Sequence, residues 1–344
     1  MPRKQPAISR AKLATRKKAS GRLALLALGF LIGLLILGKL ISVLAALQKP
    51  LSSDILTHKK YTWDSHTSIN LVVKSKTISV VNYDPVNKKI IILSIPDDAY
   101  FSLPHDLGSW RVSSIYDLGQ EENPPQGAQL LKDSLSQLLG LPIDGYVMVS
   151  GSDQDKPVNQ LISSLKNPFA VIGFVHQIKT DLTPLEAFNL FKAMAGTRAD
   201  KITMLDTKDS AITQSELLPD SSRVLGIDNV QMDLFIRDKM SDMQIGQEGK
   251  SIAIFNATSH PGLAAMASRE ITNMGGNVIF TASTDNLLQQ SLVTSSDKST
   301  TWERLSQVFA PQCLNTKCAS ADPKISSSRA EINVILGEDY YQGL

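Results

Sequence analysis

The chain has 344 residues, of which 42% are hydrophobic and 20% charged, enough for two domains with cores of their own. Its formal net charge of +2 hides an asymmetry: the first 22 residues hold eight Lys and Arg and no acid, whereas the remainder holds 27 bases and 33 acids. A mildly acidic remainder excludes a nucleic-acid surface as the main function, and an aromatic content of 6% disfavours a sugar platform of stacked Trp.

The N-terminal segment predicts a membrane anchor. Residues 23–47 form an apolar run of 25 residues whose one charge is Lys39, and about 20 apolar residues are enough for a helix to cross a bilayer. The basic residues 1–22 favour a cytoplasmic N-terminus, which places the bulk of the chain outside the membrane. A cleaved signal peptide is the alternative, with Ala45-Ala46 as a cleavage point, although its apolar core is usually shorter.

Polar sequence follows the anchor and then gives way to strands. Residues 48–67 lack periodicity and are predicted to be a stalk. Apolar runs bounded by turn residues predict strands at 69–73, 77–83 and 88–96. Residues 97–126 are rich in Pro and Gly, and we expect a loop there.

Helices and strands alternate after this loop. Residues 127–140 carry five leucines on one helical face and end at Gly140, the residue type that favours a left-handed helix end. Thr183 and Glu186 form a capping-box pattern that opens another helix. The other expected elements are strands at 144–150, 169–175 and 201–206, and helices at 157–165 and 229–240.

A polar stretch, residues 241–250, is predicted to link a first unit at 68–240 to a second at 251–344. In the second unit we expect strands at 251–257, 277–282 and 331–337, with one helix opening at Pro261 and another capped by Thr300 and Glu303. Strands that alternate with helices indicate an α/β fold in both units.

Five segments resemble a known family. NYDPVNKKIIILSIPDDAYFSLP (82–104), RVSSIYDLG (111–119) and the helix-plus-strand stretch 127–149 are similar to the core of the LytR–CpsA–Psr (LCP) family. FNATSHPGLA (255–264) together with VILGEDY (334–340) resembles the LytR C-terminal domain. The resemblance implies a divergent LCP-like α/β domain with a central mixed sheet, followed by a small α/β LytR C-terminal domain.

The resemblance also implies a chemistry. Such enzymes are understood to move a cell-wall polymer from a polyprenyl pyrophosphate lipid onto peptidoglycan. This requires cations that hold the pyrophosphate, for which the Arg fork is well suited. It also requires carboxylates that hold Mg²⁺ or Mn²⁺, and an apolar groove for the lipid tail.

The chain departs from the family at positions that carry this chemistry. Asp97 stands where the family has the Arg of Ser-Ile-Pro-Arg, and Lys76 stands where it has a metal-binding Asp. The family's Lys-Ile-Asn becomes Arg111 and Ser113, and Arg198 is the lone Arg where the family has an Arg-rich stretch. Because lost cations and carboxylates weaken transition-state stabilisation, the departures predict a degenerate site without a catalytic metal.

Four residues remain as candidates for ligand binding or catalysis. Lys74 and Lys76 lie two residues apart on an extended stretch and would share a face toward an anionic polymer, although lysines at a hairpin tip are more often a solvated edge. Arg111 is a candidate phosphate ligand, with a surface ion pair as the alternative. Asp98 is a candidate catalytic acid, or a residue that caps the turn after its strand.

Five further residues are assigned structural roles. Asn256 is expected to form an Asx turn that leads into the helix at Pro261, and Gly262 is expected to permit a close backbone approach. Cys313 and Cys318 form either a local disulfide, which suits an extracytoplasmic location, or two free thiols. The five histidines show no metal-ligand spacing.

Three functions follow from this sequence. The first is a membrane-anchored, extracytoplasmic envelope protein that binds or scaffolds wall polymer without catalysis. The second is an active phosphotransferase that attaches glycopolymers to peptidoglycan and uses Mg²⁺ or Mn²⁺. The third is a membrane-anchored envelope regulator. The expected partners are the lipid bilayer, peptidoglycan or an anionic glycopolymer, and a polyprenyl-phosphate lipid, with no nucleic acid and no further cofactor.

Overall fold

The computed structural model describes residues 39, 42, 47, 49–52, 57, 59–164, 167, 176–209 and 212–343. Most of the predicted anchor at 23–47 and all of the basic tail at 1–22 therefore lie outside the described residues, as does the predicted strand at 169–175. Within the described part of the chain, no helix combines the length and the apolar character that a membrane crossing needs. Residues Pro50–Leu344 form one unit.

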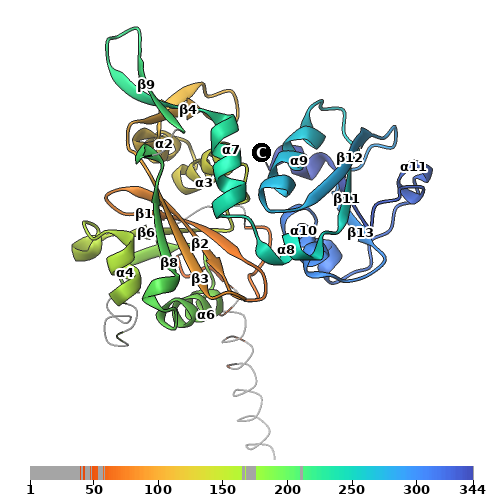
Figure 1. Ribbon diagram of the computed structural model, residues 1–344, viewed down its shortest axis with the longest axis horizontal. Helices are drawn as coiled ribbons and strands as arrows, with labels where there is room; N and C mark the ends of the chain where they lie inside the picture. Colours follow the sequence, from red (N-terminus) through yellow and green to blue (C-terminus); the bar gives the residue numbers. More distant parts are fainter. Residues whose placement is uncertain are drawn as a thin grey trace, which may run out of the picture. The chain divides into compact units, whose positions relative to one another are not determined.

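A six-stranded mixed sheet organises the first half of this unit (Figure 1). Its strands, in spatial order, are β7 (Ile178–Thr180), β6 (Gly145–Val149), β1 (Ile69–Lys74), β2 (Ile78–Asp84), β3 (Lys89–Ile95) and β8 (Ile202–Asp206). The pairs β1–β6 and β3–β8 are parallel, and β1–β2, β2–β3 and β6–β7 are antiparallel. The expected central mixed sheet is confirmed.

Helices cover both faces of this sheet because its strands are apolar on both sides. On β1, Ile69 and Leu71 pack toward α4 (Val158–Ser164) and α6 (Pro184–Ala195), whereas Val72 packs toward the opposite layer. That layer contains α2 (Val112–Gln120) and α3 (Gly127–Leu139). The predicted capping box of α6 is present, since Thr183 accepts from the Glu186 N–H and Glu186 accepts from the Thr183 N–H.

The predicted loop at 97–126 is wrong in part, because it contains two strands and a helix. A second sheet has the order β5 (Ser109–Arg111), β4 (Ala99–Ser102), β10 (Arg223–Ile227) and β9 (Thr213–Leu217). Helix α2 begins after Arg111 without a side-chain cap, so the usual signature of a helix start is missing from its sequence.

The second half of the unit contains a third sheet, of order β12 (Asn277–Ser283), β11 (Ser251–Asn256), β14 (Ile332–Leu336) and β13 (Leu292–Ser295) (Figure 1). Helices α9 (Leu263–Asn273) and α10 (Thr300–Phe309) pack on one face, and α11 (Pro323–Ser326) packs on the other. The last helix is α12 (Glu338–Gln342). Short 3-10 helices occur at Gly151–Asp153, Ala199–Lys201, Thr207–Asp209 and Pro311–Leu314.

The predicted linker at 241–250 contains a packed helix. Helix α7 (Asn229–Lys239) is followed by α8 (Met243–Glu248), whose first N–H groups are capped by the Asp242 carboxylate. Glu248 then accepts hydrogen bonds from the backbone N–H groups of Thr300 and Thr301 at 2.9 and 2.8 Å. The segment therefore joins the two halves rather than separating them.

The interval predicted to be a stalk also differs where the structure describes it. Residues 59–67, which we call the strap, pack against the first half, with Trp63 only 3% exposed. The Trp63 N–H donates to Glu186 at 2.6 Å, and the Lys59 Nζ donates to the same carboxylate at 2.5 Å. The buried partners of this polar segment are residues distant in sequence, so local periodicity did not reveal it.

One hydrophobic core runs through both halves. It includes Leu139 on α3 and Ile236 on α7, and it continues to Leu263 and Ile271 on α9. Gly140 permits the close approach: its backbone is left-handed (φ 56°), and a Cβ there would come within 2.5 Å of the Asn273 amide nitrogen.

Candidate functional site

Lys74 lies against an aromatic pair rather than in a cluster of cations. Its Nζ is 4.8 Å from the centre of the Tyr116 ring, a distance at which the ring face attracts a cation. Tyr116 in turn stacks on Tyr146, with ring centroids 6.2 Å apart. The end of β1 is thus anchored to α2 through Lys74.

Lys76 and Arg111 face other partners. The Lys76 Nζ is 3.8 Å from Asp155, and both side chains are largely exposed. The Arg111 guanidinium donates to the Arg223 carbonyl oxygen at 3.4 Å. It faces the β9–β10 turn, where the pKa of Asp220 is lowered first by hydrogen bonds from Ser222 and to a smaller extent by Arg111. Because β1 ends at Lys74, Lys74 and Lys76 do not share the face that an extended stretch would give them.

The two acids after β3 do not form a metal site. Asp97 is exposed, and its carbonyl oxygen accepts from the Ser113 N–H at the start of α2. The Asp98 carbonyl oxygen accepts from the Leu225 N–H on β10. With Lys76 in place of the family's metal-binding Asp, the residues present here do not fit a divalent metal.

The only three possible metal ligands that gather within the described residues are Asp64, His66 and Glu303, whose ligand atoms lie within 4.8 Å of one another. They bring the strap together with α10. Burial raises the pKa of Glu303, and the neighbouring Asp64 carboxylate raises it further.

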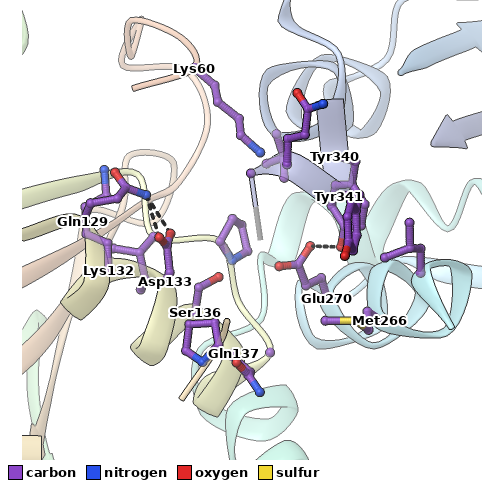
Figure 2. Close-up of a pocket in the computed structure, with 18 of the residues that line it drawn as sticks. Lys60, Gln129, Lys132, Asp133, Ser136, Gln137, Met266, Glu270, Tyr340 and Tyr341 are labelled. Carbon is purple, nitrogen blue, oxygen red and sulfur yellow. Dashed lines mark hydrogen bonds between the residues drawn. The ribbon is translucent and has the colours of Figure 1, made fainter. Parts of the chain in front are cut away.

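A cavity of about 650 Å³ is lined by both halves of the unit. The strap, the β4–β5 loop and α3 line it on one side, and α9, α10 and α12 line it on the other. Figure 2 shows Asp133 on α3 and Glu270 on α9 at opposite walls, with the Lys60 side chain reaching toward the space between them. Tyr340 and Tyr341 from α12 add ring surface to one wall.

Half of the charged side chains that line this cavity are already paired. Lys59 pairs with Glu186, Lys132 with Asp181 at 2.9 Å, Arg269 with Asp233 at 2.8 Å, and Asp144 with Arg304 at 2.9 Å. The charged lining side chains without an ion pair to any described residue are Lys60, Asp106, Asp133 and Glu270. The cavity therefore has more unpaired acids than unpaired bases.

Asp133 and Glu270 have neutral hydrogen-bond partners instead of cations. The Gln129 amide donates to both oxygens of Asp133 at 2.7 and 2.8 Å, and the Tyr340 hydroxyl donates to Glu270 at 3.3 Å. Burial raises the pKa of both carboxyls, and Lys60 is among the groups that oppose this rise in each case. Burial also raises the pKa of Tyr340.

Arg304 and Asp144 form a buried ion pair beside the cavity. Their side chains are 1% and 3% exposed, and the Tyr61 hydroxyl on the strap donates to Asp144 at 2.8 Å while accepting from Arg304 at 2.6 Å. Burial alone would lower the pKa of Arg304, but Asp144 and Tyr61 raise it above its usual value. The strap, the first half and α10 thus meet in one satisfied network.

The residues assigned structural roles in the second half lie near the cavity. The predicted Asx turn is confirmed: Asn256 accepts from the Thr258 N–H at 3.1 Å, and its amide donates to the His260 carbonyl oxygen at 2.7 Å. Pro261 is not the first helical residue, because α9 begins at Leu263. Gly262 provides a left-handed backbone (φ 88°) before that helix, and a Cβ there would meet nothing within 4 Å, so close approach is not its role.

The two cysteines are joined. Cys313 and Cys318 form a disulfide across a separation of five residues, with their Cα atoms 5.4 Å apart. Cys313 is buried against the shared core just after α10.

Two family models match this chain. Residues 59–163 match the LytR_cpsA_psr family, and residues 250–340 match the domain described as LytR cell envelope-related transcriptional attenuator. The predicted resemblance is confirmed in both parts of the chain. The first match begins at Lys59, and therefore includes the strap.

Individual proteins are similar to parts of this chain. "Regulatory protein MsrR" of Staphylococcus aureus strains is 30% identical over 89 residues, which are 26% of this chain and 25% of the relative, so the match spans a quarter of that protein. Two solved Bacillus subtilis structures are also similar. TagV is 17% identical with a TM-score of 0.39, over 49% of this chain and 94% of that one. TagT is 12% identical with a TM-score of 0.38, over 55% and 94%.

The cavity residues were missed by the sequence analysis. Asp133 and Glu270 each lie on an amphipathic helix among other polar residues, and Lys60 lies in a segment without periodicity. Nothing in the local sequence separates them from a solvated helix face. Only the packing of the two halves into one unit brings them to the same cavity.

Proposed function

We propose that this chain is a membrane-anchored, extracytoplasmic envelope protein that binds or scaffolds cell-wall polymer without transferring it. The observation that carries the proposal is the separation of the candidate phosphate ligands. Lys74 contacts Tyr116, Lys76 faces Asp155, and Arg111 faces the β9–β10 turn. A pyrophosphate needs several cations directed at one point.

The cavity between the two halves supports a binding role. Its volume of about 650 Å³ falls within the range of small-molecule sites. Its lining combines many charged and polar side chains with apolar and aromatic ones, which suits a polar segment of glycopolymer or peptidoglycan. Residues of both halves line the cavity, so both halves would contact such a ligand.

Turnover and binding measurements test this proposal together. The full-length chain in detergent is incubated with a polyprenyl pyrophosphate-linked glycan and Mg²⁺ or Mn²⁺, and released phosphate and pyrophosphate are measured. We expect no turnover, but co-sedimentation of the chain with peptidoglycan or glycopolymer. Turnover that Arg111→Ala abolishes would instead establish the phosphotransferase. A chain that neither turns over nor sediments with wall material contradicts both functions.

The proposed location rests on the charge and hydropathy of the first 47 residues. We expect protease added to cells with a permeable wall to degrade the part of the chain after residue 50. Deletion of residues 2–20 is expected to alter topology alone. If it changes envelope gene expression while topology is preserved, the regulator function is favoured.

A further inference from the structure

The cavity between α3 and α9 has a charge pattern that specifies its ligand. Four cations line it, but Lys59, Lys132 and Arg269 pair with Glu186, Asp181 and Asp233, which do not line the cavity. These three cations therefore stabilise the fold through ion pairs and are not available to a ligand. An anion that entered would meet Lys60 as its one unpaired cation among the described lining residues.

The unpaired acids in the same cavity have no such ion pairs with described residues. Asp133 and Glu270 project from opposite walls (Figure 2), and Asp106 lies in the adjoining β4–β5 loop. No described residue forms an ion pair with any of the three. The hydrogen-bond partners of Asp133 and Glu270 are neutral groups, namely the Gln129 amide for Asp133 and the Tyr340 and Ser136 hydroxyls for Glu270, and they leave carboxylate lone pairs available for further donors.

We infer that this cavity binds a primary ammonium group, carried on a neutral polar ligand, between Asp133 and Glu270. An ammonium group offers three donors and a full positive charge, which match the carboxylate lone pairs that Asp133 and Glu270 present to the cavity. The Tyr340 and Tyr341 rings suit a cation or the apolar face of a sugar. The inference deepens the proposed function, since it names the class of wall material that the module recognises.

Two kinds of wall component carry this group. One is an amino sugar without its acetyl group, and the other is a diamino acid side chain of a peptide. Both present the same ammonium, and the cavity volume of about 650 Å³ accommodates either with its neighbouring residue. The structure does not choose between the amino sugar and the diamino acid, so the experiment below compares them.

The titration of the two carboxyls gives the inference a distinctive signature. Asp133 is faced by Lys132 on its own helix, His105 from the β4–β5 loop and Lys60 from the strap. Glu270 is faced by Lys60, Arg269 and Tyr340. Burial nevertheless raises the pKa of both carboxyls, and a bound ammonium lowers it again, so amine binding should weaken as the pH falls and the carboxyls become protonated.

The test is calorimetric titration of the full-length chain in detergent with two matched pairs of probes. One pair is a glucosamine disaccharide and its N-acetylated counterpart, and the other is a lysine tripeptide and its Nε-acetylated counterpart. We expect at least one free amine to bind at pH 7 and to bind more weakly as the pH is lowered, and both acetylated probes to bind at least about tenfold more weakly at pH 7. The tighter amine identifies the source.

Variants separate the cavity from other effects. Asp133→Asn and Glu270→Gln should each weaken amine binding by about tenfold or more, whereas Asp117→Asn, an exposed acid on α2, should leave it unchanged. Lys60→Met should strengthen binding, because it removes a like charge. An anion site predicts the opposite sign for Lys60→Met, and a merely structural role of the two acids predicts no gain in binding.

The inference is overturned if neither amine binds, if the acetylated probes bind equally well, or if Lys60→Met weakens binding. Thermal unfolding of each variant shows whether it is folded. Co-sedimentation with peptidoglycan is measured in parallel. Sedimentation that Asp133→Asn leaves unchanged overturns the ammonium site alone, and absence of sedimentation by the unmodified chain overturns the proposed function.

Discussion

Asp133 illustrates the cost of keeping an unpaired acid in a cavity. Burial raises the pKa of its carboxyl in the folded chain above the value in the unfolded chain. The folded state therefore favours the protonated form, and the stability linked to this group is present at low pH and lost as the pH rises through the folded pKa. A site that is ready for a cationic ligand is thus destabilising while it is empty.

This linkage gives a prediction for the chain without ligand. Asp133→Asn, which resembles the neutral acid, should raise the Tm at pH 7 by on the order of 2 °C, and the difference should shrink as the pH falls toward 4. Thermal unfolding followed by circular dichroism across this range is the measurement, with Asp117→Asn as the exposed control. An Asp133→Asn variant that is less stable than the parent at pH 7 would contradict the linkage.

Arg304 and Asp144 are also buried charged residues, but each is compensated by the other. Both are almost fully buried, but each has the other at 2.9 Å and Tyr61 as a shared hydrogen-bond partner. Removing one member of such a pair leaves a buried charge without compensation. These two residues are committed to the fold, whereas Asp133 and Glu270 remain available.

At the scale of elements, the strap shows where sequence analysis succeeded and where it failed. Strands β1, β2 and β3 and helix α3 were predicted because each carries its own apolar pattern and its own end signal, such as Gly140. The strap has neither. Its burial depends on Glu186 and Asp144, more than 80 residues away, so its role could not be read from its own residues.

The candidate site shows a similar division. The departures from the family at Asp97 and Lys76 could be read from the sequence, and the structure places these residues at exposed positions. The cavity could not be predicted, because Asp133 and Glu270 are 137 positions apart and become neighbours only when the two halves pack. Tertiary contact rather than periodicity defines that site.

The strap makes its own contribution to stability, chiefly through Trp63. The ring is 3% exposed, packs edge-to-face on Tyr83 with centroids 6.2 Å apart, and donates to the Thr67 carbonyl oxygen at 2.7 Å. Trp63→Ala should lower the free energy of unfolding by about 3–5 kcal/mol, measured by urea denaturation. Trp110→Ala is the matched control: Trp110 is 39% exposed, and its loss should cost roughly half as much. Equal costs would mean that the strap adds little.

At the scale of the whole unit, the two halves share a hydrophobic core and a set of hydrogen bonds that run from α9 to the end of α3. Arg269 on α9 donates to the carbonyl oxygens of Gln137 and Leu138, at the end of α3, at 2.5 and 2.9 Å. These are carbonyls that a helix end leaves without partners. Asn273 adds a bond to the Leu139 carbonyl oxygen at 3.1 Å, so the second half caps a helix of the first.

This arrangement predicts how the unit unfolds. Because the core and the helix cap are shared, separating the halves would expose apolar surface and leave buried carbonyls unpaired. Calorimetry of the full-length chain should therefore show one cooperative transition for the two halves together. Arg269→Ala removes four hydrogen bonds between the halves and should split or broaden that transition, whereas Arg329→Ala, at an exposed position, should not. Two well-resolved transitions in the unmodified chain would show that the halves fold independently, and a cavity that needs both of them could not then be rigidly formed.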